Sequence, residues 1–470
     1  MLGMGNMRQW LMNISLVGGW FPAAAFAVVA VLSVTLLVSA AVSKRDGRIL
    51  ANVLPLRGAG SVPIGVAAVS GMVGYVVAWL LSDVFVVFGV GLGSRVMAWV
   101  AAGFAIAGFA IAHIVLSRGM MRVAAAILTV FAILAAAIGI DQSYGEYAPI
   151  GEDSYSQADL TGLAKRKDLI TVAQWRKQAA NGTIRNIPAN GTVNKIDIPA
   201  TKSQFEARKA LVYLPPAALA DSKRKPALPV VLMLSGQPGS PGRVFQAGGI
   251  QTMMDGYAKT HDGLAPIVIA ADQLGADSHN TLCVDSKVYG NALTYLTQDV
   301  VDWVKTNLPA AQDAKDWAIA GFSQGATCSL QIGVNHPDLF GTMIPTDSEI
   351  KPTNGSRQEM IDRFFDGDTT AYENQVPVNA IRNHAPTHQM LIIGAGEKDT
   401  TSIRNVKTIA PVAAKAGMRV AAVESSGNAH DWHAVQDVLR YGLAVFGHDT
   451  GLDGANPNLS DYPNLKRITI

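Results

Sequence analysis

The sequence predicts two fold classes in one chain: an all-α bundle of four transmembrane helices, then a three-layer α/β domain on a mostly parallel sheet. Charged residues make up 16% of the 470 residues and hydrophobic residues 49%, whereas an average soluble domain has about 25% charged residues. Ionisable residues are few between residues 20 and 140 and become frequent after residue 141. The second half alternates short apolar runs with helical patterns, which is typical of βαβ units.

Four N-terminal stretches are long enough to cross the hydrocarbon core of a membrane, which takes about 20 apolar residues. They cover residues 20–42, 62–81, 96–116 and 123–140. The first stretch could be mistaken for a cleaved signal peptide. Such a peptide has a shorter apolar core and a small-residue cleavage site, and three further spans follow here. We therefore interpret the first stretch as a retained helix.

Basic residues in the short loops predict the orientation, because cytoplasmic loops are enriched in Lys and Arg. The first loop carries Lys44, Arg45, Arg48 and Arg57, the second only Arg95, and the third Arg118 and Arg122. Loops one and three are therefore expected in the cytoplasm and both termini outside, although Arg8 speaks mildly against this. The acidic segment 141–153 also fits an extracytoplasmic C-terminal half. We expect a multi-pass protein of the cell membrane.

The apolar stretches are rich in Ala, Gly and Val, and small residues let membrane helices approach closely. We favour a tight bundle over a groove that receives a lipid. His113 is the one ionisable side chain deep in a span, which makes it a functional candidate. We favour a neutral histidine hydrogen-bonded to a neighbouring helix. The internal repeats and paired broken helices of a transporter are not seen in the sequence.

The second half divides into a polar connector (141–189), an α/β domain (190–448) and a C-terminal tail (449–470). The connector contains one predicted amphipathic helix at 168–180 around Trp175. The domain is expected to begin with a hairpin at 195–198 and 210–214. Buried strands are then predicted at 229–234, 266–270, 317–320, 342–345, 390–393 and 418–423, with helices between them, among them 292–308 and 410–416.

One motif carries chemistry: Gly321-Phe322-Ser323-Gln324-Gly325 reads G-x-S-x-G between a predicted strand and a predicted helix. A side chain two residues either side of Ser323 would clash with the neighbouring strand or helix, so glycine is needed there. Such an elbow presents the serine hydroxyl at the C-terminal edge of the sheet. Any Gly-rich turn can produce the bare pattern, but the strand before it and the helix after it favour a nucleophile.

A nucleophilic serine needs a base, and the base needs an orienting acid. On sheets of this kind the acid precedes the histidine in the chain. Glu397 and Asp399 follow one predicted strand, and we choose Asp399 as the acid with Glu397 as the alternative. His430 and His433 follow the next strand. We choose His430 as the base, because His433 lies one turn further into a helix.

An oxyanion hole needs two N–H donors, each worth about 3 kcal/mol in the transition state. The residue after the nucleophile should supply one, the backbone N–H of Gln324. The loop 235–239 should supply the other, and Gln237 is the candidate because Pro238 has no N–H.

Other residues point less clearly to a role. Cys283 and Cys328 could form one disulfide or remain free in the core. Asp347 and Glu349 could bind polar groups of a substrate, although we favour a solvated loop. The sequence has no H-E-x-x-H motif and no basic tract with interleaved aromatic residues, and the net charge is +2. No metal, cofactor or nucleic acid is therefore expected.

These residues resemble the putative esterase family of the α/β-hydrolases, which includes esterase D, enterochelin esterase-like proteins and the antigen 85 mycolyltransferases. The matching pieces are segments 208–215, 321–325, 397–399 and 427–432, and the resemblance spans about residues 190 to 448. It implies an α/β-hydrolase fold and a triad of Ser323, His430 and Asp399, with an oxyanion donor at Gln237. The loop 272–285 does not match the trehalose-binding region of the mycolyltransferases, which favours ester cleavage over mycolyl transfer.

The residues and the resemblance together predict a membrane-anchored serine esterase that forms an acyl-enzyme on Ser323. Several helices before an external esterase resemble actinobacterial envelope proteins, which implies a lipid or acylated glycan of the cell envelope as the substrate. One alternative is an acyltransferase of the same fold. A second is a lipid transporter or sensor with a non-catalytic hydrolase-like module, which the presence of every triad member disfavours. The sequence does not set an oligomeric state.

Overall fold

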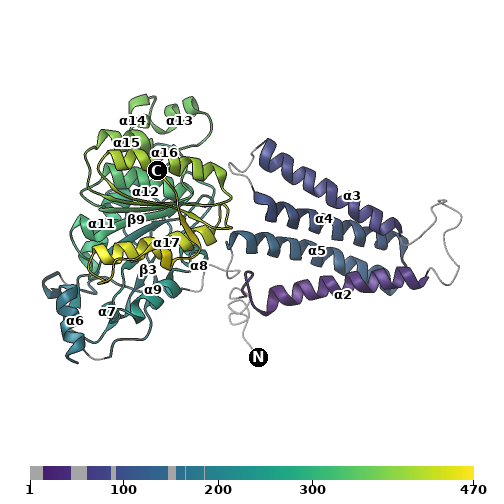
Figure 1. The fold of residues 1–470 in the computed structure, drawn as a ribbon, viewed down its shortest axis with the longest axis horizontal. Helices are drawn as coiled ribbons and strands as arrows, with labels where there is room; N and C mark the ends of the chain where they lie inside the picture. The colour runs from purple at the N-terminus through teal and green to yellow at the C-terminus, as the bar shows by residue number, and fades with distance from the viewer. Residues whose placement is uncertain (1–13, 44–60, 86–91, 147–154, 165, 185) are drawn as a thin grey trace. The chain divides into compact units, whose positions relative to one another are not determined.

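A computed structural model describes residues 14–43, 61–85, 92–146, 155–164, 166–184 and 186–470. The chain forms two compact units, Met1–Gly151 and Glu152–Ile470. Figure 1 shows the first unit as a bundle of long helices and the second as a sheet covered by helices on both faces.

The N-terminal unit consists of α2 (Trp20–Ser43), α3 (Ser61–Trp79), α4 (Gly93–Leu116) and α5 (Met120–Tyr144). A π-helical turn, η1 (Leu80–Val84), continues α3. All four helices are long and apolar enough to cross a membrane, and together with η1 their candidate spans cover Trp20–Ser39, Ser61–Val84, Gly93–Leu116 and Met120–Tyr144. The basic residues of the first loop, Lys44, Arg45, Arg48 and Arg57, and also Arg8 lie outside the described residues.

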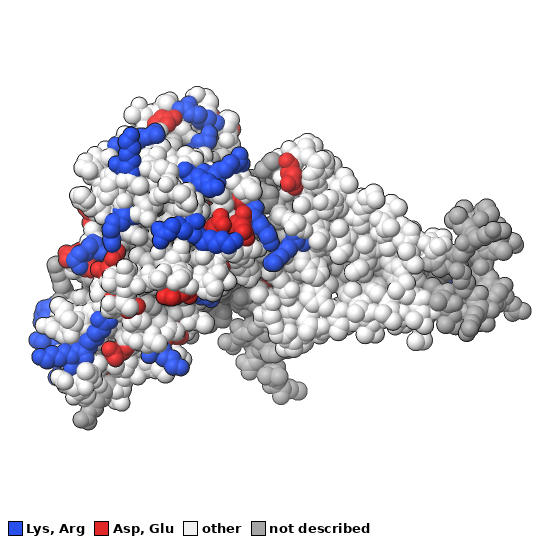
Figure 2. Space-filling view, in the orientation of Figure 1, with Lys and Arg blue, Asp and Glu red and all other residues white. Residues whose placement is uncertain are grey.

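The outer surface of the bundle is apolar. Among the described residues, every exposed large hydrophobic side chain except Ile470 belongs to this unit. In the face drawn in Figure 2 the bundle is almost entirely white, whereas charged side chains gather on the other unit. A soluble protein rarely exposes so much apolar surface, so a membrane location is plausible for these helices.

Small residues bring α3, α4 and α5 into close contact. A Cβ added to Gly108 of α4 would lie 2.6 Å from the Cβ of Ser70 on α3, and one added to Gly103 would lie 2.7 Å from the Cβ of Ala136 on α5. His113 of α4 is buried. Its Nδ1 lies 3.0 Å from the carbonyl oxygen of Phe109, one turn earlier in the same helix. The expected hydrogen bond to a neighbouring helix was therefore wrong.

The C-terminal unit is built on a nine-stranded sheet in the order β13-β12-β11-β10-β9-β5-β6-β3-β2. The central strands β6, β5, β9, β10, β11 and β12 are parallel, and β3, β2 and β13 add antiparallel edges. The strands are β2 (Thr192–Ile196), β3 (Ala210–Leu214), β5 (Val230–Leu234), β6 (Ile267–Ala270), β9 (Trp317–Phe322), β10 (Thr342–Thr346), β11 (Met390–Gly396), β12 (Arg419–Ser425) and β13 (Leu465–Arg467).

Helices cover both faces of this sheet, so the unit has three layers (Figure 1). The strands alternate between two cores: Leu232 of β5 faces one, and its neighbours Val231 and Met233 face the other. On one face lie α11 (Val300–Asn307), α12 (Gln324–Asn335), α15 (Pro377–Asn383) and α16 (Thr400–Lys415). On the other lie α8 (Pro241–Ala247), α9 (Ile250–Lys259) and α17 (Trp432–Asp449). This is the α/β-hydrolase-like arrangement that the sequence predicted.

Element boundaries differ from the expectation in several places. Strand β2 covers Thr192–Ile196 rather than 195–198, and α16 covers Thr400–Lys415 rather than 410–416. The connector helix α6 (Val172–Ala180) begins later than residue 168, because the Thr171 side chain caps it in a capping box with Gln174. Strands β11 and β12 continue to Gly396 and Ser425, so the acid and histidine loops start later than predicted. The segment expected as a tail pairs with β12 through β13 and forms an edge of the sheet.

Candidate active site

The serine elbow lies at the C-terminal end of β9, immediately before α12. Ser323 has φ 54° and ψ −116°, a backbone conformation that L residues seldom adopt. Its N–H donates to the Thr346 carbonyl of β10 at 3.0 Å. A Cβ at Gly321 would lie 2.2 Å from the carbonyl oxygen of Gly325, and one at Gly325 would lie 2.3 Å from that of Ser235. Both glycines are therefore required by the close approach of backbone, as the motif predicted.

His430 connects the serine to an acid. Its Nε2 lies 2.9 Å from Ser323 Oγ, and its Nδ1 lies 2.7 Å from Asp399 Oδ2. The imidazole packs against the ring of Phe322, which in turn contacts the buried Trp432. The structure thus brings together the three residues that the sequence predicted. Ser323 is hydrogen-bonded to His430, and His430 is hydrogen-bonded to Asp399.

Asp399 is held in place by the helix that follows it. It is the N-cap of α16, and its Oδ1 accepts hydrogen bonds from the backbone N–H groups of Thr401 and Ser402. Its Oδ2 remains for His430. Burial opposes the negative charge, but the hydrogen bonds and the charge of His430 outweigh burial and lower the pKa of Asp399 to about 2. Asp399 is therefore ionised whenever His430 works as a base.

Glu397, the alternative acid, does not reach His430. Its carboxylate accepts the N–H of Gly427 at 2.7 Å and pairs with Lys466 at 2.9 Å. These contacts brace the loop that carries His430 instead. His433, the alternative base, lies in the first turn of α17 and is half-buried. The geometry therefore selects Asp399 over Glu397 as the acid and His430 over His433 as the base.

The charges around His430 favour its protonated form. Burial lowers the pKa of the imidazole, but the Asp399 hydrogen bond and the charges of Asp347, Asp399 and Glu349 outweigh burial and raise it above the ordinary 6.5. The general base must be neutral, so activity is lost as the pH falls through this pKa.

We therefore expect kcat/KM for an ester such as p-nitrophenyl acetate to fall on the acid side with its half-point above pH 6.5. A pH series on the full-length protein in detergent measures this half-point. Glu397→Gln removes an exposed acid that does not contact His430 and should leave the half-point unchanged. A half-point below that of an ordinary imidazole would contradict the assigned environment of His430.

Two backbone N–H groups are free to bind an oxyanion. Within the described residues, neither Gln237 nor Gln324 donates its backbone N–H to another group. Gln324 is the first residue of α12, where a helix leaves its N–H groups unpaired. The loop 235–239 comes close to the serine, since a Cβ at Gly236 would lie 3.5 Å from Ser323 Cβ. The peptide bond between Gln237 and Pro238 is cis.

Arg208 anchors the same loop, a role that the sequence did not reveal. Its guanidinium donates to the Gly239 carbonyl at 2.9 Å and to Oδ1 of Asp272 at 2.8 Å. Asp272 is fully buried and also accepts the N–H groups of Leu274 and Gly275. Arg208 and Gly239 are 31 positions apart, so no local pattern could indicate this contact.

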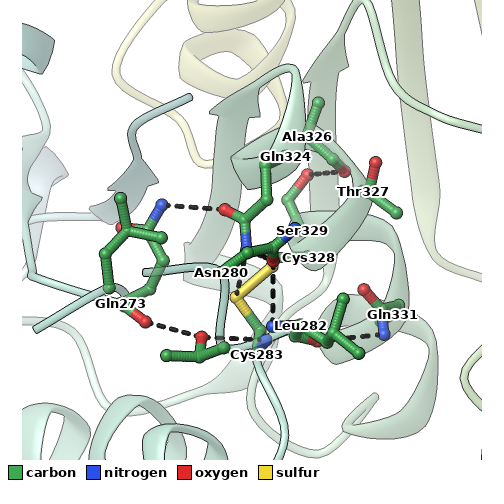
Figure 3. Close-up of a disulfide and its surroundings, with 12 residues drawn as sticks. Gln273, Asn280, Leu282, Cys283, Gln324, Ala326, Thr327, Cys328, Ser329 and Gln331 are labelled. Atoms are coloured by element: carbon green, nitrogen blue, oxygen red, sulfur yellow. Dashed lines mark hydrogen bonds between the residues drawn. A yellow bond between two sulfur atoms is a disulfide. The ribbon is translucent and has the colours of Figure 1, made fainter. Parts of the chain in front are cut away.

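A disulfide joins Cys283 to Cys328 and fixes the loop 272–285 to α12 (Figure 3). The neighbouring side chains form a polar network: Gln273 donates to Gln324 Oε1 at 3.2 Å, and Gln324 donates to Asn280 Oδ1 at 3.3 Å. The Gln324 side chain is therefore buried in this network. The network holds this loop against Gln324, the residue after the serine.

Asp347 and Glu349 do not form the solvated loop that the sequence favoured. Asp347 is fully buried and Glu349 is half-buried. Burial raises the pKa of Glu349 to about 7, against the opposing charge of His430. One ligand atom each of Asp347, Asp399 and His430 lie within 4.8 Å of one another. His430 already uses one ring nitrogen for Asp399 and the other for Ser323, so two members of this cluster belong to the hydrogen-bonded series from Ser323 to Asp399.

Comparisons with known proteins found the following similarities. An uncharacterized protein of Corynebacterium glutamicum is 31% identical over 326 residues, which is 68% of this chain and 74% of that protein. An S-formylglutathione hydrolase from Agrobacterium tumefaciens has a TM-score of 0.46 at 16% identity, covering 57% of this chain and 98% of its own. MPT51 of Mycobacterium tuberculosis has a TM-score of 0.40 at 13% identity, covering 55% of this chain and 98% of its own.

A family model, "Putative esterase", matches residues 202–442, which is about half of the chain and contains the serine elbow, the acid and the histidine. On this match and the 31% identity to the corynebacterial relative, the chain belongs to the Putative esterase family.

Proposed function

We propose that this protein is a membrane-anchored serine esterase that acts outside the cytoplasm on an acyl ester of a cell-envelope lipid or glycolipid. The observation that carries the proposal is the continuous hydrogen-bonded series from Ser323 Oγ through His430 to Asp399, with distances of 2.9 and 2.7 Å. Membership of the esterase family supports the same reaction class.

In the first half-reaction, Ser323 Oγ attacks the carbonyl carbon of the ester while His430 Nε2 takes the hydroxyl proton. The carbonyl oxygen becomes an oxyanion, which the N–H groups of Gln324 and Gln237 would bind. The tetrahedral intermediate then expels the alcohol, which receives its proton from His430. An acyl-enzyme and a free alcohol result. Asp399 keeps the imidazole in the required tautomer and stabilises its positive charge.

In the second half-reaction, His430 Nε2 takes a proton from water, and the hydroxyl oxygen attacks the acyl carbon. Collapse of this second intermediate returns the proton to Ser323 Oγ and releases the carboxylic acid. A second alcohol in place of water would give acyl transfer instead. Product analysis with water alone and with added glycerol separates the two outcomes.

The four apolar helices support a substrate at the membrane. They would hold the α/β domain at the lipid surface, where esters of long acyl chains are concentrated. An extracytoplasmic site also fits the disulfide, because disulfides persist in oxidising compartments. A protease added to intact spheroplasts should release the C-terminal domain, whereas full protection would reverse this orientation.

A fluorophosphonate probe tests the nucleophile directly, because it reacts covalently only with an activated serine. We expect membranes that contain the wild-type chain to show a labelled band at 49.6 kDa. Ser323→Ala and His430→Ala should abolish this band. Ser278→Ala removes an exposed serine of the neighbouring loop and keeps the backbone carbonyl that Gln237 contacts, so it should label normally. Labelling that survives Ser323→Ala would refute the proposal.

A comparison of envelope lipids between wild-type and Ser323→Ala strains then tests the substrate class. An acylated lipid or glycolipid should accumulate in the Ser323→Ala strain. If the envelope lipids are the same in both strains and the wild type is fully labelled by the probe, the protein is an esterase that acts on diffusible substrates instead.

A further inference from the structure

Asp347 is a buried carboxyl that the mechanism above does not use. It follows β10 directly and has φ 54°, so the chain turns sharply at this residue. Its N–H donates to the Gly394 carbonyl, and its Oδ1 accepts the N–H of Gly396, both at 2.9 Å. Its Oδ2 is buried and has no hydrogen-bond partner among the described residues. A buried polar atom without a partner destabilises the folded state, so its retention calls for an explanation.

The sheet explains where this carboxyl lies. Strands β9, β10, β11 and β12 are adjacent and parallel. Each is followed at its C-terminal end by one group of the cluster: Ser323, Asp347, Asp399 and His430 in turn. Asp347 therefore stands between the nucleophile's strand and the acid's strand. One of its ligand atoms lies within 4.8 Å of those of both Asp399 and His430.

Several charged groups face this cluster. Burial raises the pKa of Asp347 well above its ordinary value, His430 opposes this, and Asp399 and Asp431 add to it. His430 is faced by Asp399, by Asp347 and by Glu349. Burial and the charge of Asp399 thus disfavour the ionised form of Asp347 in the resting site, and a proton on His430 stabilises that form.

We propose that Asp347 is a second acid for His430, a positioning residue that stabilises the imidazolium formed during acyl transfer and orients the ring in place of Asp399 when Asp399 is lost. The inference rests on the proposed function. Asp347 acts through its carboxyl group, one ligand atom of which lies within 4.8 Å of those of His430 and Asp399, and it forms no covalent bond. In the wild type its contribution is small, because Asp399 already holds His430.

A double-mutant cycle on the full-length protein in detergent tests this proposal, with p-nitrophenyl acetate as the substrate. Asparagine keeps the shape of Asp347 and can still accept the Gly396 N–H, so Asp347→Asn removes little besides the acid. We expect Asp347→Asn alone to lower kcat/KM about 3-fold, and about 30-fold or more in an Asp399→Asn background. Asp399→Asn alone should lose less than the roughly 10⁴-fold typical of a sole triad acid.

The pH profile gives a readout that a merely structural residue would not change. Because the negative charge of Asp347 raises the pKa of His430, Asp347→Asn should move the acid half-point of kcat/KM to lower pH. Equal losses from Asp347→Asn in both backgrounds, or an unmoved half-point, would overturn the inference.

Two controls keep the outcomes distinct. If Asp347→Asn does not fold, Asp399→Asn decides alone: a loss as large as that of His430→Ala would show that no second acid acts, and a smaller loss supports one. If His430→Ala keeps wild-type activity, the proposed function itself fails. If His430→Ala is inactive and the cycle is additive, only the role of Asp347 fails.

Discussion

Replacing Ser323 by Ala should lower kcat/KM for p-nitrophenyl acetate by about 10⁴-fold or more, the size of loss typical of serine triads. Replacing His430 by Ala should cost a similar factor. The double replacement should cost no more than either single one. Ser323 Oγ and His430 Nε2 are 2.9 Å apart and share one proton, so either change removes the same step of the reaction.

Steady-state kinetics of the three variants, in detergent at matched protein concentration, measures this non-additivity. Thermal unfolding of each variant shows whether the fold is kept. His433→Gln serves as a matched control. His433 lies on α17, three residues after His430, and it is not part of the hydrogen-bonded series of Ser323, His430 and Asp399. It should retain activity close to that of the wild type. Losses that multiply in the double variant would mean that the two residues do not act as one unit.

The parts of the site that could be predicted are those that depend on local sequence and chain order. The elbow needs only five consecutive residues between a strand and a helix, so its pattern is visible in the chain. Asp399 was found because acids after this strand meet the histidine in α/β sheets. The choice of Asp399 over Glu397 depends on the turn: Asp399 caps α16, whereas Glu397 points to the loop of Gly427.

The parts that could not be predicted depend on contacts between distant segments. Asp347 was expected in solvent because most carboxylates are exposed. Its burial follows from its place beside strand β11, where the Gly394 carbonyl accepts its N–H and the Gly396 N–H donates to its Oδ1. The hydrogen bond from Arg208 to the Gly239 carbonyl likewise forms only when the fold brings these distant segments together. His113 could be located in a span, but its partner Phe109 is set by side-chain rotation within one helix.

Loss of the disulfide should reduce the stability of the C-terminal unit. Cys283 and Cys328 are both buried, and the bond closes a loop with a sequence separation of 45. Closing a loop of that length in the unfolded chain stabilises the folded state by about 4 kcal/mol in the chain-entropy model. Replacing both cysteines by Ala should therefore lower the melting temperature of the C-terminal unit by roughly 6 °C. Differential scanning fluorimetry of the full-length protein measures this change.

The redox state supplies the control for this experiment. With a reductant strong enough to open the buried bond, the wild type should melt close to the double-Ala variant, which has no bond to lose.

Loss of the disulfide should also weaken substrate binding, because the polar network of Gln273, Gln324 and Asn280 is built on the loop that the disulfide holds. We expect a higher KM with a smaller change in kcat. Equal melting temperatures under oxidising conditions, or free thiols in protein isolated from membranes without reductant, would show that the bridge does not form in the cell. An extracytoplasmic position of the domain would then lose its chemical support.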